Sequence, residues 1–315
     1  MSEQRTLFPG LEEPRRGPVG PASVAPEVAA LAARLPAGLR LGTSSWSFPG
    51  WQGLVYDRPA SEQELARTGL AAYAQHPLLR AVGVDRSYYQ PLRAATWAAY
   101  AAVVPPGFRF LAKAWDRTTD PQGPGFLDPQ LATQEVVGPA VEGLGERLGA
   151  LLFQLPPLDL RALAGPGKLA ERIYAFLSAL PPGPRYALEV RSRGLVGPAL
   201  AEALRAAGVS PCLSAHPQVP LLPEQAALLA PAVERGPLVM RWMLHRRHTY
   251  QDARERYAPF DRLVDEDPET RADLAGLAGA ALRAGREVLI TINNKAEGSS
   301  PCSLLRLAEA IADAR

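Results

Sequence analysis

The sequence predicts an α/β fold, a (β/α)8 TIM-like barrel that forms a single domain over residues 38–315, because three observations agree. Short apolar runs alternate with helix-like segments from Arg40 to the end of the chain. This part of the chain is close to the size of about 250 residues that such barrels usually have. No linker-like stretch interrupts the alternation, so one barrel explains the pattern better than two doubly wound domains.

Eight apolar runs of five or six residues are the expected strands, and most of them end on polar side chains. They are Arg40–Ser45, Ala81–Asp85, Arg109–Lys113, Ala150–Gln154, Tyr186–Arg191, Val209–Ser214, Leu238–Trp242 and Val288–Asn293. The segments between them carry apolar residues at helical spacing, as Leu65, Leu70 and Tyr73 do in the first. The expected helices are Glu62–Gln75, Ala94–Val103, Gln134–Gly145, Lys168–Leu180, Pro198–Ala207, Glu224–Glu234, Pro268–Ala284 and Ser303–Ala314.

Residues 1–26 are rich in proline and glycine, a composition that resists regular structure, and we expect a disordered tail there. Within it, Gln4, Leu7 and Phe8 form a Q-x-x-L-F pattern that resembles the peptide by which bacterial replication and repair proteins dock on the sliding clamp. The resemblance implies that Leu7 and Phe8 enter an apolar pocket while Gln4 forms hydrogen bonds. The alternatives are an ordinary tail, or one in which Phe8 packs on its own domain.

Bulk composition excludes several classes of protein. The formal net charge is only +2 over 315 residues, so overall charge gives no reason to expect binding to nucleic acid or anionic membranes. Cys212 and Cys302 match neither a disulfide framework nor a metal-ligand spacing, and the carboxylates and histidines show no metal motif, so we expect neither a metal nor a cofactor. The N-terminus has no signal-peptide core and no apolar run is long enough to cross a bilayer, which predicts a cytoplasmic protein without a membrane partner.

The candidate site follows from the rule that barrel enzymes carry their active sites at the carboxyl ends of the strands. The stretch Arg185–Arg193 is the most unusual, because Glu189 and Arg191 share one face of an otherwise apolar strand. Buried charges are costly unless paired, so this face should hold an ion pair or open onto a polar pocket. Strand alternation directs these further side chains toward the barrel axis: Ser44, Trp46, Asp85, Ser87, Lys113, Trp115, Gln154, Ser214, His216, Arg241, Thr291 and Asn293.

Seven strand ends, read together, resemble a known family. The segments LGTSSWSFPGW, VGVDRSYYQP, FRFLAKAWDRTT, LGALLFQLPP, YALEVRSR, LVMRWM and LITINN are similar, in order and spacing, to the motifs of domain-of-unknown-function family 72, also called YecE-like. The resemblance implies a TIM-like barrel but no established activity. It implicates Ser44, Trp46, Trp51, Tyr89, Lys113, Gln154, Pro156, Glu189, Arg191, Arg241, Asn293 and Asn294 as pocket residues.

The departures from the family pattern indicate a divergent member. Gly83 stands where the family usually has glutamate, and Asp85 where it has asparagine. Ser87 replaces a threonine, and Ser192 replaces a histidine. After the seventh strand, Arg241–Leu244 replaces the usual R-x-H-G. We therefore expect a substrate that differs from that of typical members.

Candidate chemistry centres on Glu189, Asp85 and Lys113 as acid, base or nucleophile, with Arg191 and Arg241 holding an anion. The alternative is that Glu189 and Lys113 serve only in salt bridges. The leading hypothesis is a hydrolase or lyase acting on a small anionic substrate, phosphorylated or derived from nucleic acid. The first rival is a non-catalytic nucleic-acid-binding module tethered to the clamp, and the second is a sugar-active hydrolase that uses the two carboxylates.

The loop after the seventh strand, His245–Tyr257, is long and rich in arginine, histidine and tyrosine. Such a loop over a barrel mouth serves either as a lid and ligand contact or as a solvated surface. Several acidic residues lie between Asp252 and Asp267, and their charges could neutralise the arginines of this loop.

Overall fold

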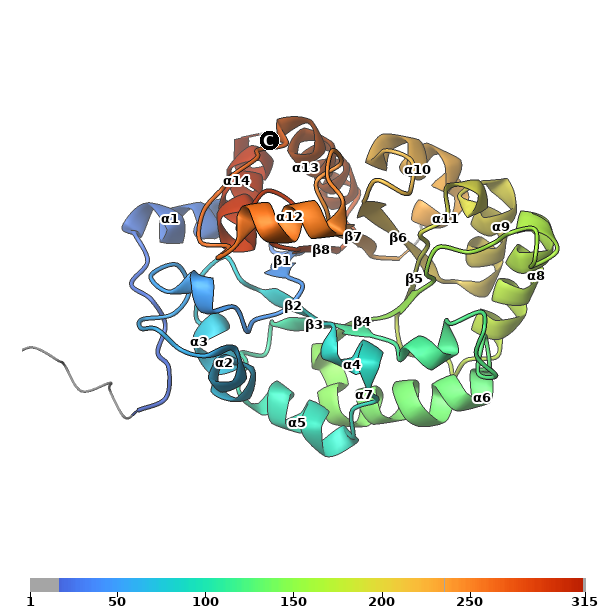
Figure 1. Cartoon of the computed structure of the whole chain (residues 1–315), viewed down its shortest axis with the longest axis horizontal. Helices are drawn as coiled ribbons and strands as arrows, with labels where there is room; N and C mark the ends of the chain where they lie inside the picture. Colours follow the sequence, from blue (N-terminus) through green and yellow to red (C-terminus); the bar gives the residue numbers. More distant parts are fainter. Residues whose placement is uncertain (1–16, 235, 314–315) are drawn as a thin grey trace, which may run out of the picture.

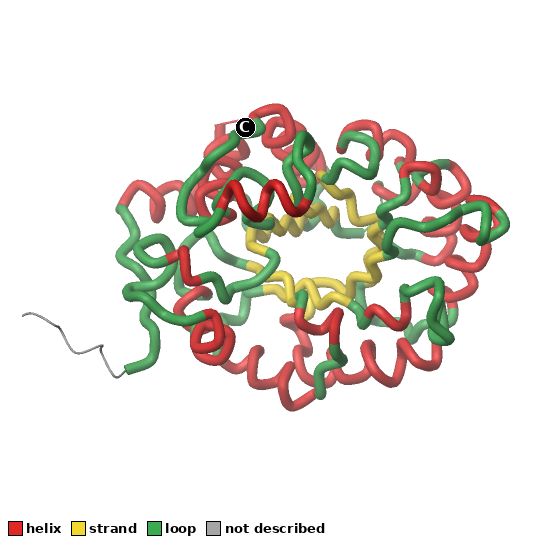
Figure 2. The backbone as a smooth tube through the Cα atoms, in the orientation of Figure 1, coloured by secondary structure: helices red, strands yellow, loops and turns green. Residues whose placement is uncertain are grey.

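Eight parallel strands close into a barrel in the computed structural model, which describes residues 17–234 and 236–313. Neighbouring strands in the sequence are neighbours in the sheet, and β8 closes the ring against β1 (Figures 1 and 2). The strands are β1 Leu39–Thr43, β2 Ala81–Val84, β3 Arg109–Lys113, β4 Leu148–Gln154, β5 Tyr186–Glu189, β6 Ser210–Ala215, β7 Leu238–Trp242 and β8 Val288–Ile292. The predicted (β/α)8 barrel is confirmed.

A ring of helices surrounds the barrel, and helices lie in every connection between strands (Figure 2). They are α1 Pro26–Arg34, α2 Glu62–Thr68, α3 Leu70–Tyr73, α4 Arg86–Tyr89, α5 Ala94–Ala102, α6 Pro129–Ala132, α7 Gly138–Leu144, α8 Gly165–Ser178, α9 Pro198–Ala207, α10 Leu222–Leu228, α11 Ala230–Val233, α12 Tyr250–Tyr257, α13 Pro268–Arg283 and α14 Ser300–Asp313. The sequence did not predict α1, α4, α6 or α12. The predicted helix Gln134–Gly145 is a π-helical turn, Thr133–Val137, that runs into α7.

Strand alternation builds two apolar layers. Side chains on the outer face of the strands join the helices in one large core, in which Phe110, Phe153 and Ile290 are fully buried. The inner face forms a smaller cluster that fills the lower part of the barrel: Ala81, Leu111, Ala150, Leu152, Ala187, Cys212, Val239 and Leu289. Because residues two positions further along each strand share the inner face, the polar strand ends lie directly above this plug.

The part of the predicted disordered tail that the structure describes, residues 17–25, is ordered. Residues 17–25 lie along the loop after β1, where the backbone N–H of Ala22 donates to the carbonyl of Val55 at 2.9 Å and that of Asp57 to Gly20 at 3.0 Å. Val19 and Ala22 are buried. Apolar side chains between the prolines therefore anchor this segment, in spite of its composition, and α1 follows at Pro26 beside α14 (Figure 1). Gln4, Leu7 and Phe8 lie outside the described residues.

Two short helices flank the barrel mouth. Helix α4 follows β2, and α12 lies in the loop after β7, on the other side of the ring (Figure 1). A capping box between Thr249 and Asp252 starts α12, and Ala253 and Tyr257 anchor it by burial. Two of the four arginines of this loop are locally neutralised: Arg246 pairs with Asp267 at 2.8 Å, and Arg256 pairs with Asp265 at 2.7 Å.

Candidate functional site at the barrel mouth

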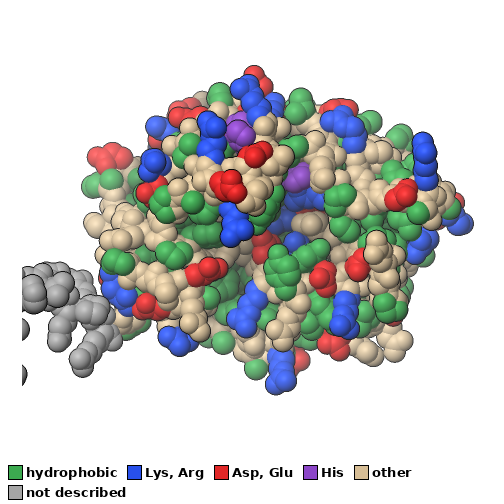
Figure 3. Space-filling model, in the orientation of Figure 1, with side chains coloured by type: hydrophobic (Ala, Val, Ile, Leu, Met, Phe, Trp, Pro, Cys, Tyr) green, Lys and Arg blue, Asp and Glu red, His purple; other side chains and the backbone are tan. Residues whose placement is uncertain are grey.

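A cavity of about 260 Å³ opens at the carboxyl ends of β4 to β8. Its lining residues follow those strands or come from α12: Gln154, Pro157, Arg191, His216, Gln218, Met243, Leu244, Tyr250, Asn293 and Lys295. The space-filling view looks toward this mouth and shows a hollow below α12, with cationic and histidine side chains beside it (Figure 3). The cavity thus lies where barrel enzymes carry their sites.

Glu189 and Arg241 form the centre of a charged network beneath the cavity. Arg241 Nη1 donates to Glu189 Oε2 at 2.6 Å and to Gln154 Oε1 at 3.1 Å. Its Nη2 donates to Asp85 Oδ1 at 3.2 Å, and Arg191 Nη2 forms an ion pair with Glu189 Oε1. One guanidinium therefore bridges carboxylates from β2 and β5, and the structure confirms the expected ion pair on the Glu189 face.

The network keeps Glu189 ionised. Burial by itself would raise the pKa of this carboxyl, but the charges of Arg191 and Arg241 and the hydrogen bond from Arg241 outweigh burial and lower the pKa to about 2. Burial also disfavours the charge of Arg241, yet Glu189 and Asp85 raise its pKa above the ordinary value. Glu189 has no exposed surface, so it can neither reach a ligand nor exchange protons near pH 7. The predicted acid–base role does not fit this environment.

Arg191 is the cation that the network turns toward the cavity. Only 7% of it is exposed, and it is among the lining residues. Its one carboxylate partner within the described chain is Glu189, while its Nε is buried without a hydrogen-bond partner. Burial lowers the pKa of Arg191, an effect that Glu189 opposes and the neighbouring Arg241 reinforces. An anion in the cavity would add a second negative partner for this guanidinium.

Lys113 and Asp85 extend the charge cluster toward β2 and β3. Burial lowers the pKa of Lys113 from 10.5 to about 8, with Asp85 opposing the shift and Arg241 adding to it. The Lys113 ammonium lies 3.6 Å from the centre of the Tyr88 ring, a cation–π contact. Asp85 retains 32% of its side-chain exposure, so it is the accessible carboxylate of the site.

The cavity is also lined by Lys295, which the sequence analysis did not predict, and by His216, to which it assigned no role. Lys295 lies with its Nζ 4.4 Å from the centre of the Tyr250 ring and 3.4 Å from Asn293 Oδ1. Asn293 also donates to Ser44 Oγ at 2.8 Å, which joins β8 to β1. The position of Lys295 just after a strand end is the one signal in the sequence. His216 lines the cavity, and burial, reinforced by Arg191, lowers its pKa to about 4, so it is neutral at pH 7.

Three residues that we expected to contact a ligand are buried and do not line this cavity. The Trp46 indole donates to the carbonyl of Leu65 at 3.0 Å and packs among the surrounding helices. Trp51 is fully buried and donates to Asn294 Oδ1 at 3.2 Å. Asn294 also accepts from the backbone and hydroxyl of Ser300, at 2.8 and 2.7 Å, and so fastens the loop to the start of α14.

Tyrosines form the rim of the mouth. Tyr89 on α4 is 76% exposed and Tyr250 on α12 is 61% exposed. The pKa of Tyr89 is raised mainly by partial burial and further by Asp85 and Tyr250, which places the two phenols within electrostatic reach of each other. Exposed aromatic rings on both sides of a polar cavity offer flat surfaces for a ligand to stack on.

Two features are absent from the described part of the chain. No group of three or more histidine, cysteine, aspartate or glutamate side chains there is arranged to hold a metal ion. No helix in those residues is long and apolar enough to cross a membrane.

Comparisons with known proteins agree with the fold. A family model described as "Protein of unknown function DUF72" matches residues 40–315. A DUF72 family protein from Enterococcus faecalis V583 is 20% identical, with a TM-score of 0.60 over 87% of this chain and 95% of its own. A DUF72 family protein from Thermotoga maritima MSB8 is 19% identical, with a TM-score of 0.53 over 86% of this chain and 98% of its own. No curated protein matches the chain.

Proposed function

The chain belongs to the DUF72 family of proteins of unknown function, and we propose that it is an enzyme, a hydrolase or lyase, whose mouth cavity binds a small phosphorylated anion derived from a nucleotide or nucleic acid. The observation that carries the proposal is Arg191, a buried cation that lines the cavity and shares Glu189, its one carboxylate partner in the described chain, with Arg241. A guanidinium in this state favours phosphate or carboxylate oxygens, which accept from its planar fork.

The balance of charge supports an anionic ligand. Arg191 and Lys295 line the cavity itself, and Arg241 lies beneath it. Glu189 is sealed off by the two arginines, which leaves Asp85 as the exposed carboxylate of the cluster. Neutral His216 adds a donor: its Nδ1 accepts from the backbone of Gln218 at 3.2 Å, so its proton is on Nε2.

Lys113 and Asp85 are the groups that we assign to proton transfer. An amine with a pKa of about 8 exchanges protons near neutral pH, as a general acid or base must. Asp85 is exposed enough to accept a proton from water or substrate. Glu189 then acts as a positioning residue, because its ionised carboxylate holds both guanidiniums in place.

The rim tyrosines favour a substrate with a planar base over a simple phosphate. Tyr89 and Tyr250 offer exposed rings above a cationic cavity, a combination that suits stacking of an unpaired base next to a bound phosphate. The sugar-active alternative loses support, because a glycosidase needs two carboxylates facing the substrate and Glu189 faces only arginines. Tethering to the sliding clamp depends on Gln4, Leu7 and Phe8 and remains a separate proposal.

Gln218 provides the test of the anion site, because it is an exposed lining residue and Gln218→Glu changes charge with almost no change in shape. We expect Gln218→Glu to weaken binding of nucleoside monophosphates at least fivefold by calorimetry, while Gln218→Ala changes it less than twofold. Equal affinities for Gln218→Glu and Gln218→Ala would refute the anion site. If the protein hydrolyses phosphoesters, Lys113→Met should abolish this activity and Gln218→Ala should retain it. That result would support the proposal that the protein is an enzyme.

A further inference from the structure

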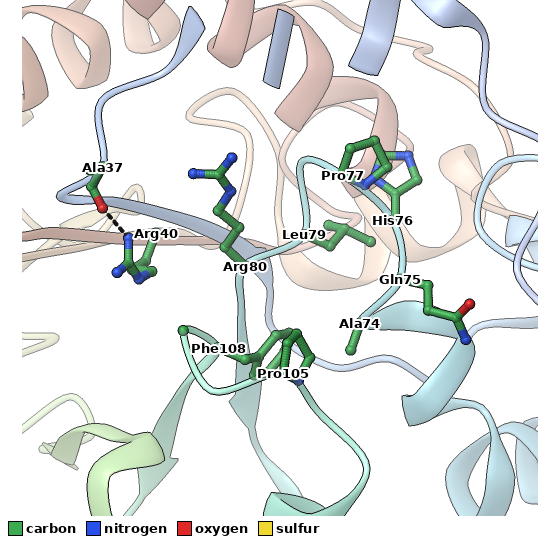
Figure 4. Close-up of a pocket in the computed structure, with 11 residues that line it drawn as sticks. Ala37, Arg40, Ala74, Gln75, His76, Pro77, Leu79, Arg80, Pro105 and Phe108 are labelled. Carbon is green, nitrogen blue, oxygen red and sulfur yellow. Dashed lines mark hydrogen bonds between the residues drawn. The ribbon is translucent and has the colours of Figure 1, made fainter. Parts of the chain in front are cut away.

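The opposite end of the barrel holds a second and larger cavity. It has a volume of about 380 Å³ and lies at the amino ends of β1, β2 and β3, beside the loops that lead into them (Figure 4). The mouth cavity lies at the carboxyl ends, and the apolar plug inside the barrel separates the two. A ligand in one cavity therefore cannot extend into the other.

Arginines gather at this end. Arg40 and Arg80 line the cavity, and Figure 4 shows both side chains at its edge. Arg109, at the start of β3, is close enough to interact with Arg40. Burial lowers the pKa of Arg40, and the positive charges of Arg109 and Arg80 lower it further, against the opposing effect of Glu287. Three like charges thus converge at the base of the barrel.

These arginines lack carboxylate partners in the described chain. Arg80 donates to the carbonyl of Ala32 at 3.1 Å, and Arg109 to those of Pro106 and Phe108, both at 3.0 Å. Glu287, whose negative charge raises the pKa of Arg40, is paired with Arg185.

Arg40 itself donates to the carbonyls of Ala37 and Leu39, and its Nε is buried without a hydrogen-bond partner. Backbone carbonyls satisfy donors but do not neutralise charge. The cluster is therefore left with unbalanced positive charge around an open cavity.

The remaining walls suit an apolar group. Pro77 and Pro105 present apolar pyrrolidine rings to the cavity. His76 lies among them, and burial lowers its pKa to about 4, so it carries no charge at pH 7. Its Nδ1 accepts from the backbone of Leu78 at 3.3 Å, which puts the ring proton on Nε2 and makes that nitrogen a donor. A neutral donor and two prolines would accept a flat ring more readily than a second charge.

From these walls we infer a second ligand site at the base of the barrel, for a small anion with a flat apolar body whose phosphate or carboxylate lies between Arg40 and Arg80. Its volume falls in the range of small-molecule pockets. The site is separate from the proposed active site, so its ligand would be an effector and not the substrate held at the mouth.

The test uses 1-naphthyl phosphate, whose fluorescence reports binding, in protein that carries Arg191→Gln and Lys295→Gln to disable the mouth. We expect this protein to retain saturable binding that inorganic phosphate competes away, and 1-naphthol to bind at least tenfold more weakly. Absence of binding would overturn the proposal.

Gly107 supplies the matched variants. It lines the cavity, and a Cβ added there meets no atom within 4 Å, so a side chain can be attached at this position without a clash at Cβ. Gly107→Glu should weaken naphthyl phosphate binding at least tenfold relative to Gly107→Gln, which has the same size without the charge. Equal affinities for these two variants would place the probe elsewhere. The double variant Arg40→Gln/Arg80→Gln should lose binding while its circular dichroism stays unchanged.

Discussion

The Glu189 carboxylate accepts a 2.6 Å hydrogen bond from Arg241 Nη1, and neither side chain has more than 1% of its surface exposed. Arg191 holds the other carboxylate oxygen. Asp85 is the second carboxylate on Arg241, and the Lys113 ammonium adds a further positive charge to the cluster. Glu189 is thus the counter-ion that allows two arginines to be buried side by side.

Removing this counter-ion should be costly. We expect Glu189→Gln to lower the free energy of unfolding by about 3–5 kcal/mol, because it leaves the buried Arg191 without a carboxylate partner and Arg241 with only the partly exposed Asp85. Urea titrations monitored by tryptophan fluorescence measure the change. Asp85→Asn is the control: its carboxylate is 32% exposed, so its loss should cost about 1 kcal/mol or less. Similar costs for the two variants would contradict the central role of Glu189.

Lys113 should make stability rise with pH in the alkaline range. The folded protein releases this proton near pH 8, whereas the unfolded chain keeps it to about 10.5. The unfolded state therefore binds more protons between these values, and stability rises with pH there. Buried tyrosines such as Tyr73, whose pKa is raised by burial, act in the opposite sense.

Comparison with Lys113→Met isolates the lysine, because the tyrosines are common to both proteins. Between pH 7.5 and 10, the wild type should gain roughly 2 kcal/mol of unfolding free energy over the variant. Urea unfolding at several pH values gives the difference. A constant offset between the two proteins would mean that Lys113 titrates at its ordinary pKa.

Asn293 and Asn294 are adjacent but should behave differently. Asn294→Ala removes the acceptor shared by Trp51 and Ser300, so we expect a loss of about 2–4 kcal/mol in unfolding free energy with unchanged ligand affinity. Asn293→Ala should cost about 1 kcal/mol and weaken anion binding, because Asn293 lines the mouth and contacts Lys295. Thermal unfolding and calorimetry on both variants decide the assignment, and weakened binding in Asn294→Ala would reverse it.

Gly42 is required by the barrel. It pairs with Ala81 across β1 and β2, and a Cβ at this position would overlap the carbonyl oxygen of Ala81. We expect Gly42→Ala to destabilise the protein by about 3 kcal/mol or to abolish soluble expression. The clashing atom belongs to the backbone of β2, which cannot move aside as a flexible side chain can. Gly107→Ala, which meets no neighbour within 4 Å, should leave the unfolding midpoint almost unchanged. Equal midpoints would show that the strands can separate at low cost.

The sequence by itself determined the barrel and the inner face of its strands. Apolar runs, helical spacing and the period of two along each strand are local properties, and they correctly turned Glu189, Arg241, Gln154 and Asp85 toward one network. Even the fifth strand, which ends at Glu189 and not at Arg191, kept the expected parity.

Only the tertiary structure decided what each of these side chains touches. Alternation ceases where a strand ends: β1 stops at Thr43, so the chain turns and sends Trp46 outward to the helices. Lys295 enters the mouth from a loop, and the base cavity forms where Arg40 of β1 and Arg80, just before β2, come together with Arg109 of β3 nearby. Glu189 is ionised and held in one position because two buried arginines pair with it, Arg241 from β7 and Arg191 from the loop after β5. The contact of Glu189 with Arg241 joins residues 52 positions apart, and no local pattern encodes it, whereas the pairing with Arg191 follows from strand alternation.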